Sequence, residues 1–181
     1  SDLHEKYDKT CTIQLQVHSH RANCRLIESP GDYRACKYGF PKPILEQSMI
    51  LEPLPLSPGS ERLVFFTQKW REIRDTLAII NREGDNSEIK SLDQLLSALK
   101  MDKSQYILSI RASIKTITVF LRRQYNELMI NNYMPEVYVR HRGNMDIQYI
   151  TDPYGAAVYV SAYMLKSNAI MSVLLKRAIF D

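Results

Sequence analysis

The residues best suited to chemistry in this sequence are two histidines and two cysteines near its N-terminus. His18, His20, Cys24 and Cys36 follow the spacing H-x-H-x3-C-x11-C. Imidazole nitrogens and thiolates are ligands that zinc prefers, and four of them close a tetrahedral structural site. The spacing is not that of a standard zinc finger, so a pair of surface histidines with two buried thiols stays open as the alternative. Cys11 could replace one of the ligands, although we expect it to take no part.

A metal would matter for this part of the chain, because residues 1–50 contain few periodically placed apolar residues. Zinc binding stabilises small finger peptides by roughly 10–16 kcal/mol, enough to replace a missing core. The His-Ser-His triplet is also similar to the His-hydrophobic-His pair that holds a catalytic cation in metal-dependent nicking enzymes. Because Ser19 is not hydrophobic and two cysteines follow, we interpret the cluster as structural.

Two tyrosines and a lysine share one face of a helix expected near the C-terminus. At 100° per residue, Tyr159, Tyr163 and Lys166 fall within about 60° of one another. A tyrosine, whose pKa is about 10, needs help to attack a phosphate at neutral pH, and a nearby ammonium group could favour the phenolate. Tyrosines four residues apart more often serve as amphipathic packing residues, which is the alternative.

The positive charge of the chain is concentrated in one stretch. Between residues 111 and 142 six basic residues stand against two acidic ones, an excess equal to the whole net charge of +4. Such a basic strip favours an anionic partner such as a nucleic-acid backbone, and a solvated helix face is the alternative. The basic residues are Arg111, Lys115, Arg122, Arg123, Arg140 and Arg142.

Length and composition restrict the class of protein. With 181 residues, of which 45% are hydrophobic and 24% charged, the chain resembles one soluble domain or slightly more, and not a disordered segment. Three cysteines argue against a disulfide-stapled secreted domain and favour a reducing compartment. The uncharged run 153–165 is too short to cross a membrane. The chain begins with Ser1 without a signal peptide, so we expect a piece of a longer protein.

The first half of the sequence predicts a connector followed by helices. Three prolines close together predict an extended connector over residues 51–60. Residues 61–110 have helical periodicity, interrupted by a polar turn at 81–87. The pattern Ser-Leu-Asp-Gln at 91–94 is a capping box that predicts a helix start. A second periodic run covers residues 106–117.

The second half of the sequence mixes strand and helix signals. Residues 118–121 favour a strand and residues 124–130 a short helix. Polar and apolar residues alternate over 145–150, which predicts a half-buried strand. An Asp-Pro pair then predicts the start of the tyrosine helix, over about residues 154–166, and another helix follows over about 169–180. Strands with segregated helices indicate an α+β fold.

Six stretches form an ordered series over residues 11–178. They are Gln16 to His20 with Cys24; Cys36 to Pro43; Ile50 to Leu54; Asn131 to Pro135; Asn144 to Tyr149; and Asp152-Pro153-Tyr154 through Tyr159, Tyr163 and Lys166. Together they resemble the replication-initiator (Rep) region of the helicase-containing transposase of Helitron rolling-circle transposons. Any one stretch is weakly specific, and the resemblance depends on their order and spacing.

The resemblance implies a nuclease that acts on single-stranded DNA. Helitron Rep regions are similar to HUH endonucleases of the two-tyrosine type, in which a tyrosine attacks a phosphodiester and leaves a 5′-phosphotyrosine link and a free 3′-OH. A divalent Mg²⁺ or Mn²⁺ ion held by the two motif histidines polarises the phosphate. Tyr159 and Tyr163 match the tyrosine pair, and Lys166 matches the lysine that follows. The resemblance also implies a downstream helicase domain and a nuclear location.

One part of the family pattern is absent from this sequence, namely the His-hydrophobic-His pair. In the family that pair lies upstream of the His/Cys region. We therefore expect this chain to be the C-terminal part of the nuclease region and not to nick DNA alone. Gln148, on the expected strand, is a candidate contact to the catalytic metal, with Asn144 and Asp146 beside it; a plain solvent-facing alternation is the alternative.

These observations predict an α+β fold in three parts. Residues 1–50 form a zinc-stabilised knot, residues 51–60 a Pro-rich connector, and residues 61–181 a helical region with the C-terminal part of an HUH-type nuclease. Two functions stay open: a transposase fragment that nicks and rejoins single-stranded DNA, and a non-catalytic zinc-stabilised DNA-binding module from a decayed or domesticated transposon. A zinc-stabilised RNA-binding module is a third possibility, for which no aromatic stacking motif is present.

Overall fold

The computed structural model describes residues 16–20, 24–26, 35–36, 38–141, 143, 145, 147, 149–150 and 153–161. The chain divides into two compact units, residues 1–148 and residues 149–181. In the second unit, residues 153–161 are helical. The first unit contains helices and two small antiparallel sheets, which confirms the α+β class.

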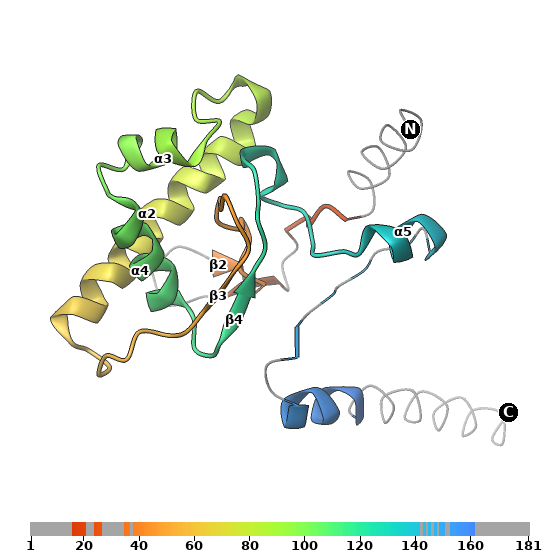
Figure 1. The fold of residues 1–181 in the computed structure, drawn as a ribbon. Coiled ribbons are helices and arrows are strands. Elements are labelled where there is room, and N and C mark those ends of the chain that lie inside the picture. Colours follow the sequence, from red (N-terminus) through yellow and green to blue (C-terminus); the bar gives the residue numbers. More distant parts are fainter. Residues whose placement is uncertain are drawn as a thin grey trace, which may run out of the picture. The chain divides into compact units, whose positions relative to one another are not determined.

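Three helices form the main core of the first unit (Figure 1). They are α2 (Glu61–Glu83), α3 (Leu92–Ala98) and α4 (Lys103–Ser113), and α2 packs against α4. The 3-10 turn η2 (Gly84–Asn86) follows α2, and Gly84 there has a φ of 56°, a left-handed conformation that glycine adopts without strain. The most deeply buried apolar residues of this core are Ile73, Leu77, Ile80, Leu95, Tyr106, Ile110 and Leu128.

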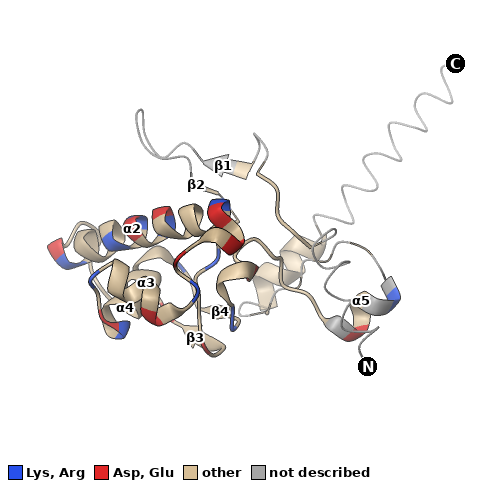
Figure 2. Ribbon diagram, turned by 90° about the horizontal axis from the view of Figure 1, so that it is seen from above, with Lys and Arg blue, Asp and Glu red and all other residues tan. Residues whose placement is uncertain are grey.

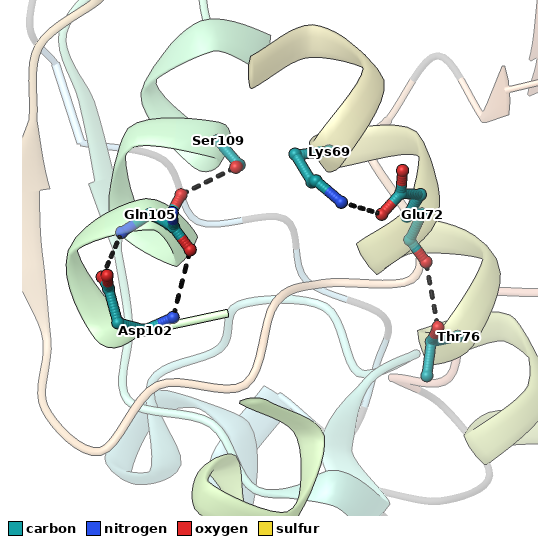
Figure 3. A network of polar contacts seen from close by, with 6 residues as sticks. All are labelled: Lys69, Glu72, Thr76, Asp102, Gln105 and Ser109. Carbon is teal, nitrogen blue, oxygen red and sulfur yellow. Dashed lines mark hydrogen bonds and ion pairs between the residues drawn. The ribbon is translucent and has the colours of Figure 1, made fainter. Parts of the chain in front are cut away.

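The starts of the helices are set by side chains that bind backbone N–H groups. Ser91 accepts a hydrogen bond from the Gln94 backbone, which confirms the helix start predicted there. The Gln94 side chain accepts from the Lys90 N–H and not from that of Ser91, so the predicted capping box is only half formed. Asp102 accepts from the Gln105 backbone at 2.8 Å, while the Gln105 side chain accepts from the Asp102 backbone at 3.3 Å (Figure 3). Because of this complete capping box, α4 begins at Lys103, three residues earlier than the apolar periodicity predicts.

Two short sheets connect segments that are distant in the sequence. Strand β3 (Met49–Leu51) pairs antiparallel with β4 (Thr118–Phe120), so the strand predicted at 118–121 is confirmed. Strand β1 (Arg25–Leu26) pairs with β2 (Ala35–Cys36). The β3–β4 pair brings the proline-rich connector next to the helical core.

Two side chains of α4 fix this connector and the chain before it. The buried Tyr106 hydroxyl donates to the Ile44 carbonyl at 3.1 Å, and burial raises the pKa of Tyr106. Arg111 donates to the carbonyls of Glu52 and Pro53, at 2.8 and 3.4 Å. Directly after β3, the connector is therefore held by the hydrogen bonds that Arg111 donates to its carbonyls.

The region after β4 differs from what the sequence predicts. The helix expected at 124–130 is a shorter 3-10 turn, η3 (Tyr125–Glu127), and α5 (Pro135–His141) begins at a proline that we did not interpret as a helix start. No strand is present at the described positions within 145–150, so the prediction of a strand there is wrong.

The second half of the tyrosine helix and the helix predicted at 169–180 lie outside the described residues. Among the helices that the structure describes, none combines the length and the apolar character needed to cross a membrane.

Candidate metal centre

Four side chains converge at one point near the β1–β2 pair. The ligand atoms of His18, His20, Cys24 and Cys36 all lie within 4.8 Å of one another. His18 Nε2 lies 3.4 Å from Cys36 Sγ, and His20 Nδ1 lies 3.6 Å from Cys24 Sγ. These four residues are the set named from the sequence, and the structure brings all of them together.

The distances between these atoms fit a shared metal ion. In a tetrahedral zinc site, Zn–S bonds of about 2.3 Å and Zn–N bonds of about 2.0–2.1 Å place sulfur and nitrogen about 3.5–3.6 Å apart. The observed separations of 3.4 and 3.6 Å match this value. The group could therefore hold a metal ion with two nitrogen and two sulfur ligands.

The local fold explains how ligands that are distant in sequence meet. In the β1–β2 ladder Arg25 is the partner of Cys36, so Cys24, the residue before Arg25, lies beside the end of the opposite strand. Both cysteines are buried, at 2% and 8% exposure, and the buried Phe40 packs with them. Gly39 turns the chain with a φ of 70° and donates its N–H to the Cys36 carbonyl.

The histidines occupy a less buried side of the cluster. The His18 ring stacks on Phe40, with centroids 4.3 Å apart and planes 6° apart, and it meets the His20 ring edge-on at 5.0 Å. Burial lowers the pKa of His18, and the charges of His20 and Lys42 lower it further. A lowered pKa keeps this imidazole neutral at pH 7, which is the form that binds a metal.

Backbone hydrogen bonds attach the cluster to the chain after η3. His18 N–H donates to the Met129 carbonyl at 2.7 Å, and Val17 forms an antiparallel bridge with Ile130. Lys42 N–H donates to the Leu128 carbonyl at 2.8 Å. At the candidate centre, Val17, His18 and Lys42 thus meet residues 128–130.

The members of the predicted basic strip lie in different environments. Lys115, Arg122 and Arg140 are exposed, whereas Arg111 is bound to the connector. Arg142 lies outside the described residues. In the ribbon of Figure 2, the blue segments that mark Lys and Arg lie on α2 and α5 as well as next to β4, together with red segments that mark Asp and Glu.

Arg123, one of the residues predicted to bind DNA, is bonded within the protein. It is only 7% exposed, and its guanidinium donates to the carbonyls of Glu127 and Ile130 and to Oδ1 of Asn132. Burial lowers the pKa of Arg123, and the charge of Glu127 partly opposes this. A count of charges could not show that the guanidinium N–H groups of Arg123 donate to acceptors within the protein.

Of the predicted tyrosine constellation, the structure describes Tyr159 alone. Tyr159 lies on the helical residues 153–161 and is 61% exposed. Tyr163, Lys166 and Gln148 lie outside the described residues. Their positions relative to Tyr159 stay predictions.

Comparisons of this chain with protein-family models, with curated proteins and with solved structures found no match.

Sequence reasoning missed two groups that complete the metal centre and its attachment. Phe40 supports His18 by stacking, and Gln16 is fully buried between two other segments. Both belong to stretches quoted for the family resemblance. The glycine before Phe40 was a signal for a turn at this place, but nothing local indicated the partners of Gln16.

Proposed function

We propose that this chain is a zinc-stabilised part of a Helitron-like Rep region that acts on single-stranded DNA. The observation that supports the proposal is the convergence of His18, His20, Cys24 and Cys36. These residues belong to the first two stretches of the resemblance, and their ligand atoms lie within 4.8 Å of one another. Zinc is the metal favoured by two imidazoles and two thiolates.

In this proposal the zinc is structural. Four protein ligands fill a tetrahedral shell and leave no open position for water or substrate. The catalytic Mg²⁺ or Mn²⁺ ion of the complete nuclease would be held by histidines upstream of this chain, with Gln148 as a further contact. The zinc would hold residues 16–42 together, because the apolar cluster among the described residues of this range is small and consists of Cys24, Cys36 and Phe40.

The DNA would meet exposed basic and aromatic side chains. Lys115, Arg122 and Arg140 are available for phosphates of a single strand, and Tyr159 is exposed as a nucleophile requires. In the cutting step the oxygen of Tyr159 or Tyr163 bonds to phosphorus and loses its proton, while the 3′-oxygen leaves as a free hydroxyl. Lys166 would favour the phenolate, and the phosphotyrosine bond keeps the strand ready for rejoining.

The contribution of Arg122 to DNA binding can be measured on this chain. Arg122→Ala should weaken the binding of a labelled single-stranded oligonucleotide uniformly across sequences. The salt dependence, log K against log[salt], should become shallower by about 0.7 for each phosphate that the variant no longer neutralises. Fluorescence anisotropy at several salt concentrations gives the slope.

The matched control for this measurement is Lys69→Ala, which removes a positive charge that is paired with Glu72 on α2. We expect the slope of this variant to stay at the wild-type value. A slope that is unchanged in Arg122→Ala, or that falls equally in both variants, contradicts a specific role for the basic strip.

A non-catalytic DNA-binding module is the second candidate, favoured by the lack of a His-hydrophobic-His pair in this sequence. Covalent capture separates the two. In the longer parent protein with its upstream histidines, Mn²⁺ should yield a DNA–protein adduct that survives denaturing electrophoresis, and the double change Tyr159→Phe, Tyr163→Phe should abolish it. An adduct that persists in the double variant overturns the tyrosine assignment, and a parent protein that binds DNA without any adduct supports the non-catalytic module.

A further inference from the structure

A short segment at the metal centre lies between two other parts of the chain. On one side, residues 16–18 contact residues 129–131: Asn131 N–H donates to the Gln16 carbonyl at 2.8 Å, in addition to the bridge and hydrogen bond of Val17 and His18. On the other side, the Gln16 side chain contacts residues 143–145. The same three residues thus connect two segments.

The amide of the Gln16 side chain forms two hydrogen bonds to the backbone of Gly143 and Met145, and we call this pair of hydrogen bonds the clamp. Its Nε2 donates to the Gly143 carbonyl at 3.0 Å, and its Oε1 accepts from the Met145 N–H at 3.2 Å. The side chain is 0% exposed, so both ends of the amide are removed from water and both are satisfied by backbone. Gln16 is not one of the four candidate metal ligands and belongs to neither apolar cluster, so these two hydrogen bonds are what explains its burial.

The clamp has one further contact beside it. Ile147 N–H donates to the Asn132 carbonyl at 3.3 Å, and Asn132 in turn accepts from Arg123. The described residues Gly143, Met145 and Ile147 are therefore held by these hydrogen bonds and are not assigned to a strand. A few hydrogen bonds alone do not offset the conformational entropy that is given up when such a segment is ordered, so the clamp itself must be held in place.

The metal centre can hold it, because the ligand His18 is only two residues from Gln16. We propose that metal binding by His18, His20, Cys24 and Cys36 fixes the path of the chain at Gly143, Met145 and Ile147, with Gln16 as the positioning residue. Those residues directly precede, in sequence, the unit that carries Tyr159. The inference rests on the metal binding of the proposed function and not on its DNA chemistry.

Hydrogen–deuterium exchange on the purified chain tests this coupling. With zinc bound, the amides of Met145 and Ile147 should exchange slowly. After chelation both should exchange faster, by on the order of tenfold or more, and zinc re-addition should restore protection, while α2 and α4 stay protected throughout. Exchange at Met145 that is the same with and without zinc overturns the proposal.

A variant separates the clamp from the metal. Gln16→Leu should still bind one zinc per chain, but its Met145 amide should exchange as fast with zinc as the wild type does after chelation. Gln94→Leu is the matched control, because the exposed Gln94 accepts a bond from Lys90 N–H on a different part of the fold; we expect wild-type exchange at Met145.

Two results for Gln16→Leu would contradict its role: wild-type protection at Met145, or loss of the zinc itself. If the variant does not fold, the chelation experiment on the wild type still decides. Neither arm measures DNA binding, so failure of the DNA-binding proposal would leave this result unaffected.

Discussion

Replacing Cys36 by serine should leave the protein without its metal and release residues 16–42 from the rest of the fold. A serine hydroxyl stays protonated at neutral pH and is a poor zinc ligand, so three ligands remain of four. The free energy lost is that of a structural zinc site, roughly 10–16 kcal/mol in finger peptides. Among the described residues of the segment, the apolar cluster that could replace it consists of Cys24, Cys36 and Phe40. We therefore expect complete local loss of structure.

The helical core should survive this change. The side chains that fill it come from α2, α3, α4 and the segments around β3 and η3, and none of the four candidate ligands belongs to that cluster. Limited proteolysis should cut within residues 16–42 of Cys36→Ser, while circular dichroism retains the helical signal. Cys11→Ser is the control and should keep its metal. A Cys36→Ser protein with wild-type metal content and protease resistance contradicts the assignment.

Arg123→Met should lower the free energy of unfolding by about 3 kcal/mol or more. The methionine retains much of the side-chain volume but removes every donor, which leaves the acceptors of Glu127, Ile130 and Asn132 without that partner. Hydrogen bonds to a charged group each contribute about 1.5–3 kcal/mol. The Glu127 carbonyl keeps a second donor, the Ile130 N–H. Reversible denaturant unfolding, with its midpoint and slope, measures the difference.

The neighbouring residue supplies the control for this prediction. Arg122 is exposed, so Arg122→Met should change the free energy of unfolding by no more than about 0.5 kcal/mol. The two variants remove the same charge from adjacent positions. They differ in that Arg123 is buried and hydrogen-bonded through its guanidinium, whereas Arg122 is exposed. Equal effects on stability would contradict the structural role of Arg123.

Local signals in the sequence predicted local structure well. The Ser-Leu-Asp-Gln pattern correctly marked the start of α3, and the β-prone residues 118–121 correctly marked β4. In these places a helix cap or a run of β-branched and aromatic residues carries most of the information. The same holds for the metal centre, where ligand type and spacing named all four residues that meet.

Sequence patterns whose structural outcome depends on residues far away in the sequence led to wrong predictions. The alternation over 145–150 is that of a half-buried strand, but a strand needs a neighbour, and the backbone N–H of Met145 instead meets the side chain of Gln16, 129 residues earlier. Charge counting likewise placed Arg123 with exposed basic residues, because burial depends on the bridge of this residue to Leu45 and on the turn that follows. Neither partner can be identified from the local sequence.

The coordination of the metal in the wild-type chain is the decisive quantity to measure. Elemental analysis of the protein, purified without added chelator, should give one zinc per chain, and X-ray absorption at the zinc edge should show two sulfur ligands at about 2.3 Å and two nitrogen ligands at about 2.0–2.1 Å. A folded protein without metal, or a zinc bound only by oxygen and nitrogen, would contradict the assignment of His18, His20, Cys24 and Cys36 as its ligands.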